Sequence, residues 1–122
     1  MFPLPSSDQS AQIEVATAGE VLRERHQQPA SVLYLDSGRV LLGVREDGVM
    51  RHQLGVVEGP FWLDAATALL EQPCAVDMVA DTRVQLRRLP LEDFKRTFDE
   101  LPVGAQALLR DMATGYCQQT EL

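Results

Sequence analysis

The sequence has few of the residues that metal centres and catalytic sites require. It contains 2 cysteines and 2 histidines in 122 residues, and Cys74 and Cys117 lie too far apart to form a short metal-binding motif. A metal-dependent jelly-roll enzyme would need a cluster of histidines with a carboxylate. Neither a Gly-x-Ser-x-Gly elbow nor a P-loop occurs. We therefore expect reduced, buried cysteines, no metal, no cofactor and no enzymatic activity.

Long apolar runs and an excess of basic residues are also missing. No stretch of about 18 apolar residues occurs, and the first residues lack the basic and apolar regions of a secretory signal. Lysine and arginine together number 11 against 18 acidic residues, a formal charge of −7. Such a charge repels phosphate backbones and anionic membrane surfaces. We expect a cytoplasmic protein that binds neither nucleic acid nor a membrane.

The length and the composition fit one folded domain. A chain of 122 residues with 45% hydrophobic residues can bury a single core. Residues 1–12 contain Pro3, Pro5 and a polar cluster, which predicts a flexible N-terminal arm. The folded domain is expected over residues 13–122.

Short strands are predicted through most of that domain. Extended runs over residues 32–35, 39–44 and 49–56 are separated by Asp36-Ser37-Gly38 and Glu46-Asp47-Gly48, which predicts hairpins. Two further short strands are expected on either side of Ala18-Gly19, and two more in the segments CAVDMVA (74–80) and RVQLRRL (83–89). In the last of these, Val84, Leu86 and Leu89 are expected to face inward, and Gln85, Arg87 and Arg88 to face water.

Three helices complete the pattern. A short helix is expected to begin at Asp64 as its N-cap and to end at Pro73. Helices at about 91–100 and 103–119 follow, each with apolar residues at spacings of three and four. The second has an apolar stripe formed by Ala105, Leu108, Leu109, Met112, Ala113 and Tyr116. The fold class is therefore mainly β with C-terminal helices.

This order of elements resembles the cyclic nucleotide-binding domain, the sensor domain of catabolite-activator-type regulators and of kinase regulatory subunits. The resemblance rests on GEVL (19–22), LYLDSGRVLL (33–42), the segment from Gly55 to Thr82 that is similar to the phosphate-binding cassette, and the two closing helices. It covers roughly residues 19–119. It implies a double-stranded β-helix jelly roll, and because the chain ends after the last helix we expect no DNA-binding domain.

The resemblance also places three residues at positions where the family holds its ligand. Leu63 stands where the family has a glycine, Asp64 where it has a glutamate for the ribose hydroxyl, and Cys74 where it has an arginine for the phosphate. A thiol supplies no positive charge and only a weak donor, and the lost arginine would supply charge-assisted hydrogen bonds of about 1.5–3 kcal/mol. The candidate ligand-binding residues of this degenerate cassette are Trp62, Leu63, Asp64, Cys74 and Ala75.

Several interpretations of these residues stay open. Trp62, beside Phe61, fits either a stacking platform for a base or the core and its rim. Arg45, Arg83, Arg87 and Arg88 could replace the missing arginine, but nothing in their spacing indicates it. The stripe on the last helix fits packing on the β-roll or pairing with a second copy. For a homodimer, the contact residues would be Leu108, Leu109, Met112 and Tyr116.

Our hypothesis is a stand-alone regulatory or binding module. It has lost cyclic nucleotide binding of the family type and acts through protein–protein contacts or an altered ligand. The alternative is a functional sensor that binds a cyclic nucleotide or another small anion with non-standard residues.

Overall fold

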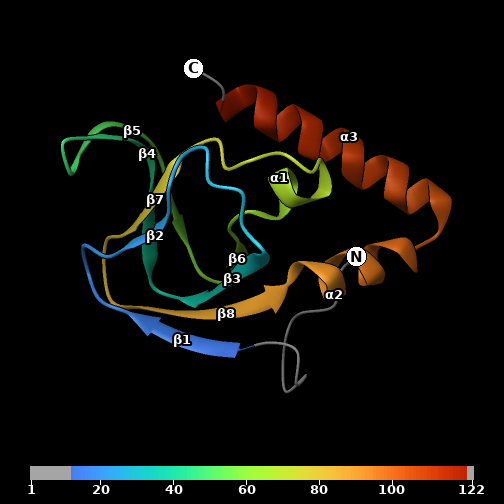
Figure 1. The fold of residues 1–122 in the computed structure, drawn as a ribbon, viewed down its shortest axis with the longest axis horizontal. Coiled ribbons are helices and arrows are strands. Elements are labelled where there is room, and N and C mark those ends of the chain that lie inside the picture. The colour runs from blue at the N-terminus through green and yellow to red at the C-terminus, as the bar shows by residue number, and fades with distance from the viewer. Residues whose placement is uncertain (1–11, 121–122) are drawn as a thin grey trace.

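The computed structural model describes residues 12–120 and contains eight strands and three helices in that range. Figure 1 shows a β-roll covered on one side by helices. The strands are β1 (Gln12–Ala16), β2 (Val21–Arg23), β3 (Ser31–Ser37), β4 (Arg39–Glu46), β5 (Val49–Glu58), β6 (Phe61–Trp62), β7 (Asp77–Ala80) and β8 (Val84–Pro90). The helices are α1 (Ala65–Leu69), α2 (Leu91–Asp99) and α3 (Val103–Thr120).

The strands form two antiparallel four-stranded sheets, which confirms the jelly-roll prediction. One sheet has the order β1-β8-β3-β6 and the other β2-β7-β4-β5. Consecutive strands along the chain often lie in different sheets, so the chain winds back and forth between them. The predicted turn at Ala18-Gly19 separates β1 from β2, and Gly19 has a φ of 94° that a residue without a side chain adopts readily.

The hairpin of β4 and β5 has the turn that the sequence predicted. Asp47 and Gly48 both have positive φ, as this kind of tight turn requires. The register between the two strands shifts next to Gly43. A Cβ atom at Gly43 would lie 2.1 Å from the carbonyl oxygen of His52, so glycine permits the close approach of the two backbones there.

The core lies between the two sheets and extends to the cassette segment. It consists of alternating residues from the facing strands, joined by apolar residues of the segments that connect them. Its members are Ala16, Leu33, Leu35, Val40, Leu42, Leu63, Val76, Met78, Ala80, Val84 and Leu86. Leu63 therefore belongs to the core.

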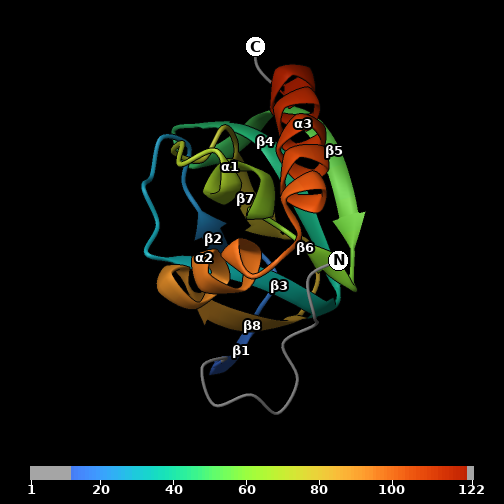
Figure 2. The same ribbon diagram turned by 90° about the vertical axis from the view of Figure 1, so that its right-hand side faces the viewer.

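The two C-terminal helices match their predicted ranges to within a residue. Phe94 and Phe98 of α2 are buried, as the apolar spacing predicted. Figures 1 and 2 show α3 lying across α1 on the same side of the roll, and these two helices pack together. Arg110 of α3 places its guanidinium 4.9 Å from the ring centre of Phe98, which joins α3 to α2.

Some predicted boundaries and orientations are wrong. Gln12, which we assigned to the N-terminal arm, begins β1, and the rest of that arm lies outside the described residues. Helix α1 ends at Leu69 rather than at Pro73, because Glu71 adopts a φ of 54° that ends the helical path. Arg87 and Arg88 are only partly exposed and form ion pairs with Asp36 and Glu14.

Candidate functional site

The cassette segment begins with a short strand that continues one sheet. Trp62 pairs with Tyr34 of β3, and beyond it the amide of Leu63 donates a hydrogen bond of 3.0 Å to the carbonyl of Leu33. This pairing holds Leu63 and Asp64 beside Leu33, along the edge of β3. Leu63 is 3% exposed, so its side chain fills the space where the family resemblance places a glycine.

Trp62 is partly buried among aromatic neighbours. Its ring packs edge-on to the ring of Tyr34, with the ring centres 5.0 Å apart, and its ring centre lies 6.2 Å from that of Phe94 on α2. These contacts join β6, β3 and α2. They favour the interpretation of Trp62 as a residue at the rim of the core.

Asp64 does not cap helix α1 through its side chain, contrary to the sequence prediction. Its carboxylate is buried and turned away from the helix, where Oδ1 accepts a hydrogen bond of 2.8 Å from the Leu33 amide. Oδ2 accepts a second bond of 2.8 Å from Nε of Arg23. Burial raises the pKa of the Asp64 carboxyl, and the charge of Arg23 together with both hydrogen bonds opposes that shift.

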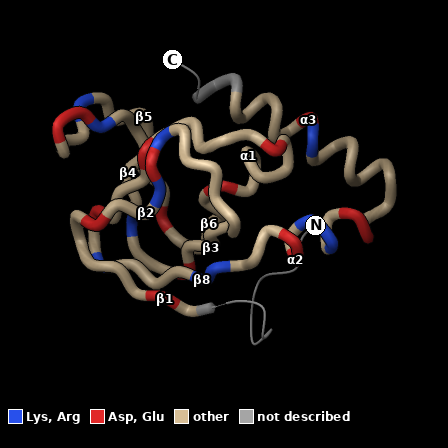
Figure 3. The backbone as a smooth tube through the Cα atoms, in the orientation of Figure 1, with Lys and Arg blue, Asp and Glu red and all other residues tan. Residues whose placement is uncertain are grey.

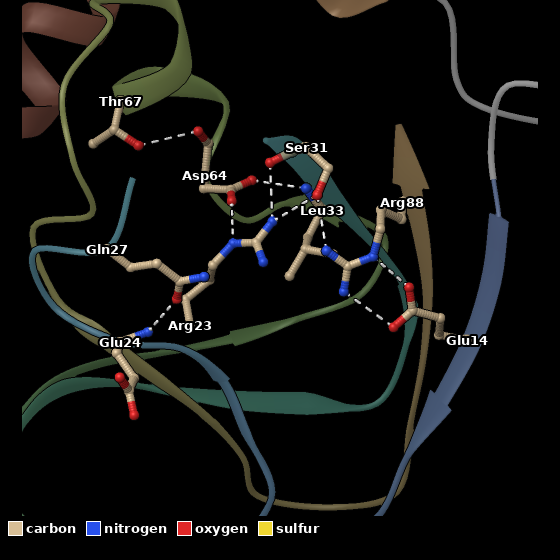
Figure 4. Close-up of polar contacts among 9 residues, drawn as sticks. All are labelled: Glu14, Arg23, Glu24, Gln27, Ser31, Leu33, Asp64, Thr67 and Arg88. Carbon is tan, nitrogen blue, oxygen red and sulfur yellow. Dashed lines mark hydrogen bonds and ion pairs between the residues drawn. The ribbon is translucent and has the colours of Figure 1, made fainter. Parts of the chain in front are cut away.

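Arg23 is the residue that sequence reasoning missed. It ends β2, its side chain is 3% exposed, and it lies 41 positions before Asp64 in the chain. Besides its bond to Asp64, its Nη2 donates to the carbonyl oxygen of Ser31 at 2.9 Å and to the Ser31 hydroxyl at 3.1 Å. Figure 4 shows the guanidinium between Asp64 and Ser31. The only feature of the sequence that could have identified Arg23 as a site residue is its position on a short strand, where it faces inward.

The four arginines that we considered as replacements lie elsewhere. Arg87 pairs with Asp36 at 2.7 Å, and Arg88 pairs with Glu14. The backbone amide of Arg45 donates to the carboxylate of Asp77, and Arg83 is exposed. None of the four lines the small cavity that the cassette encloses beside Leu63, Ala75 and Tyr116.

Cys74 is buried and neutral. It is 1% exposed, and its backbone amide and carbonyl bond to the connection after β2, at the Gln27 carbonyl and the His26 amide. Burial, together with the nearby Asp64 carboxylate, raises the pKa of the Cys74 thiol to about 11. The position therefore contributes no charge at neutral pH. Cys117 is also a free, buried cysteine.

The space at the centre of the cassette is almost filled. The remaining cavity has a volume of about 20 Å³, and its walls come from the cassette, β7 and α3. The residues around it are Leu63, Asp64, Ala66, Thr67, Ala75, Val76, Met78 and Tyr116. By comparison, a cavity needs a volume of roughly 10–15 Å³ to hold one water, and pockets that bind small ligands have volumes of roughly 300–1,000 Å³.

The apolar residues of α3 divide between two directions. Ala113 and Cys117 are buried, and Leu109 is partly buried against the roll. Leu108 and Met112 are 60% and 61% exposed. An open, mainly apolar groove of about 210 Å³ runs between α3 and the cassette, and Leu109, Met112 and Tyr116 line it together with Trp62. The interpretation as packing on the roll is confirmed for Ala113 and Cys117, and for the exposed Leu108 and Met112 pairing with a second copy stays a prediction.

Most elements of the described part of the chain contain charged residues, some basic and some acidic. Figure 3 shows basic and acidic segments interleaved over the strands and helices. No group of three or more potential metal ligands occurs among residues 12–120. No helix in that range is long and apolar enough to cross a membrane.

The comparisons with known proteins concern the fold of this arrangement. No family model and no curated protein matches the sequence. Among solved structures, the cAMP-bound EAL enzyme Bd1971 aligns with a TM-score of 0.76 at 13% identity, over 88% of this chain and 29% of that one. The cAMP-bound regulatory domain of Toxoplasma gondii PKA aligns at 0.70 and 17%, over 88% of this chain and 40% of that one.

A regulator provides the third comparison. The sensor domain of the transcriptional regulator DNR from Pseudomonas aeruginosa aligns with a TM-score of 0.72 at 20% identity, over 90% of this chain and 74% of that one. This chain thus spans less than half the length of the first two structures and about three quarters of the third. At these identities the likeness concerns the fold. The chain has the fold of a cyclic nucleotide-binding domain, as its sequence pattern predicted.

Proposed function

We propose that this chain is a regulatory module with a cyclic nucleotide-binding fold whose cassette does not bind a cyclic nucleotide. The observation that supports this most directly is the cavity of about 20 Å³ at the centre of the cassette. It has room for about one water. The module acts instead through protein contacts or through a different ligand, and it is not an enzyme.

The electrostatics of the cassette support the same proposal. Asp64 already bonds to Arg23 and to the Leu33 amide, so a ribose hydroxyl would have to compete with an ion pair for its carboxylate. At Cys74, a phosphate would meet a neutral thiol. The pairing of Asp64 with Arg23 weakens the hydrogen bond that its carboxylate could accept from a ribose, and the thiol of Cys74 replaces a charged donor to the phosphate. Each such hydrogen bond to a charged group is worth about 1.5–3 kcal/mol.

Calorimetric titration with cyclic AMP, cyclic GMP and cyclic di-GMP tests the proposal. We expect no saturable heat at micromolar concentrations for any of the three. The Asp64→Asn variant serves as a matched control for the ion pair, because it keeps the acceptor for the Leu33 amide, and it should be equally silent. Micromolar binding by the unmodified protein would contradict the proposal and support the alternative, a sensor with non-standard binding residues.

We further propose that the chain forms a homodimer through α3. Leu108, Met112 and Tyr116 together leave an apolar strip exposed along the helix, next to the groove that borders the cassette. A second copy of the same helix would bury this strip symmetrically. The groove continues from Met112 to Trp62, so the partner helix would also cover part of the cassette segment.

Sedimentation of the purified protein tests the dimer. We expect a dimer at micromolar concentrations, and a monomer when Met112 is changed to Glu, because two carboxylates would then meet in an apolar contact. Val103→Glu is the matched control, since Val103 is 82% exposed at the start of α3, outside the strip. A monomeric unmodified protein, or a dimer that Met112→Glu leaves intact, would contradict this interface.

A further inference from the structure

A second cleft opens on the structure, separate from the filled cassette. It has a volume of about 350 Å³ and lies between the connection from β2 to β3 and the junction of β8 with α2. The residues that line it are Arg23, Gln27, Pro29, Ala30, Ser31, Arg88 and Pro90. It shares no lining residue with the cassette cavity. Two arginines and no carboxylate line it, in a chain whose formal charge is −7.

The guanidinium of Arg23 has hydrogen-bonding capacity left over at this cleft. Its Nε bonds to Asp64 and its Nη2 bonds twice to Ser31. Its Nη1 donates to none of the residues that the structure describes, and Figure 4 shows that nitrogen without a bond. The side chain as a whole is 3% exposed, but Nη1 is not one of the fully buried polar atoms without a partner, so these two N–H donors reach the solvent of the cleft. An acceptor in the cleft could therefore take hydrogen bonds from Nη1 without breaking the bonds of Arg23 to Asp64 and Ser31.

Ser31 also has a donor without an acceptor. Its hydroxyl oxygen accepts hydrogen bonds from Arg23 Nη2 at 3.1 Å and from Arg88 Nη1 at 2.8 Å. A hydroxyl oxygen has two lone pairs, and the two guanidinium groups occupy both. The hydroxyl proton therefore points away from them, and no described residue accepts it. Ser31 is 8% exposed and lines the cleft.

Arg88 gives the cleft a second positive charge, which Glu14 partly offsets. Nε and Nη2 of Arg88 both bond to the carboxylate of Glu14 on β1. The carboxylate lies behind Arg88 as seen from Ser31, as Figure 4 shows. The network therefore runs from Asp64 through Arg23, Ser31 and Arg88 to Glu14, with both cations on the cleft side.

We propose that this cleft binds a small ligand through a phosphate monoester group. Arg23, which has the free donors of Nη1, and Ser31, which has the free hydroxyl proton, both line it, and Arg88 adds charge. A phosphate monoester has three terminal oxygens and a charge of about −1.5 to −2, so it can accept bonds from donors on separate residues and is attracted by both guanidinium groups. A planar carboxylate prefers the paired donors along an edge of a guanidinium, and the Nε and Nη2 donors of Arg23 are already bonded to Asp64 and Ser31. The site goes beyond the proposed function, because the cleft shares no lining residue with the cassette cavity.

Titration of the 15N-labelled protein with phenyl phosphate at pH 7.5, followed by amide chemical shifts, tests the proposal. Most of the phosphate monoester is dianionic at this pH, because its second pKa is about 6. We expect saturable shifts at Gln27, Ala30 and Ser31, with a dissociation constant of about 1 mM or lower. Benzoate, the carboxylate analogue, should bind at least fivefold more weakly. Shifts at Thr67 and Ala75 instead would indicate binding in the cassette, which would contradict the proposed function and this site alike.

Three variants separate a specific site from general attraction. Arg88→Gln should weaken phosphate binding at least tenfold, because it removes one charge and leaves Glu14 unpaired beside the cleft. Arg39→Gln is the matched control: Arg39 is also ion-paired, with Asp81, and it lines no part of this cleft, so binding should stay within twofold. Glu14→Gln should strengthen binding, an effect that loss of stability cannot produce.

Each of these measurements has an outcome that would contradict the proposed phosphate site. Absence of saturable shifts at residues 27–31 would exclude it, as would equal binding of benzoate. Equal weakening by Arg88→Gln and Arg39→Gln would show attraction to the overall charge only. If Arg88→Gln does not fold, the outcome rests on Glu14→Gln and on Ser31→Ala, which removes the hydroxyl donor and should weaken binding severalfold.

Discussion

The ion pair between Arg23 and Asp64 can be measured by a double-mutant cycle of unfolding free energies. Changing Arg23 to Met leaves the Asp64 carboxylate buried with one remaining hydrogen bond, from the Leu33 amide. Changing Asp64 to Asn keeps that acceptor but leaves a guanidinium that is 3% exposed without a counter-charge. Removing one partner of a buried pair costs about 3–5 kcal/mol, so each single variant should lose about that much.

The double variant Arg23→Met with Asp64→Asn contains neither buried charge. We expect its loss to be smaller than the sum of the two single losses by about 2 kcal/mol or more, since residues in one network are coupled by up to about 3 kcal/mol. The surface pair of Arg39 and Asp81 is the control. It has a bond of 2.6 Å but side chains that are 45% and 33% exposed, and such pairs are coupled by about 0.2–1 kcal/mol.

Urea unfolding at pH 7, followed by circular dichroism, gives all the free energies that the two cycles need. Repeating it for Arg23→Met at lower pH adds an independent check. Without Arg23, the raised pKa of the Asp64 carboxyl rises further, so the folded state binds the proton more tightly than the unfolded state. The loss of unfolding free energy caused by Arg23→Met should therefore become smaller as pH falls. A coupling no larger than that of the surface pair would refute the buried ion pair and the filled cassette that it supports.

Two further predictions concern the cassette thiol and the long hairpin. The native Cys74 thiol, with its pKa raised to about 11, should resist Ellman's reagent at pH 8 and react once urea unfolds the chain. Because its folded pKa exceeds the ordinary value of 9.0, it should also make stability fall between pH 9 and 11, a fall that Cys74→Ala should lack. Gly43→Ala should lower the unfolding free energy by about 2 kcal/mol or more, because its Cβ would meet the His52 carbonyl at 2.1 Å. Gly104→Ala, which meets nothing within 4 Å at the start of α3, should be neutral or stabilising by up to about 1 kcal/mol, and equal losses for the two alanines would contradict the steric argument.

Local patterns were sufficient to predict most of the fold. The hairpin turn at Asp47-Gly48 and the turn at Gly19 require backbone angles that few other residues adopt, so the sequence marks them directly. The apolar spacing of α2 likewise identified its buried face, with Phe94 and Phe98. These features depend on residues close together in the chain, which is the range that periodicity covers.

The filled cassette could not be predicted in the same way, because its decisive contact joins distant residues. Arg23 and Asp64 are 41 positions apart, and an arginine on a three-residue strand resembles a surface residue in sequence. Asp64 before an alanine-rich helix fits a cap equally well. The choice between a cap and a buried pair depends on where β2 lies relative to β6, and only the three-dimensional arrangement determines that.

Helix α3 shows a second limit of sequence patterns. Its apolar stripe is wider than the face that the roll can cover, so periodicity indicates burial without identifying the partner. In the structure, Ala113 and Cys117 face the roll, and Leu108 and Met112 face outward. The exposed part of the stripe is what makes the proposed dimer testable by a single substitution.

Arg23 links the two sites on which our proposals rest. One edge of its guanidinium pairs with Asp64, so a ribose hydroxyl in the cassette would have to compete with an ion pair for that carboxylate. The remaining nitrogen, Nη1, bonds to none of the described residues, and Arg23 lines the open cleft. A ligand phosphate in the cleft would draw the guanidinium away from Asp64 or share it, and either response would alter the packing of the cassette against β3. If both proposals hold, phosphate binding in the cleft should therefore change the amide shift of Leu33, whose N–H bonds to Asp64, in the unmodified protein but not in Asp64→Asn.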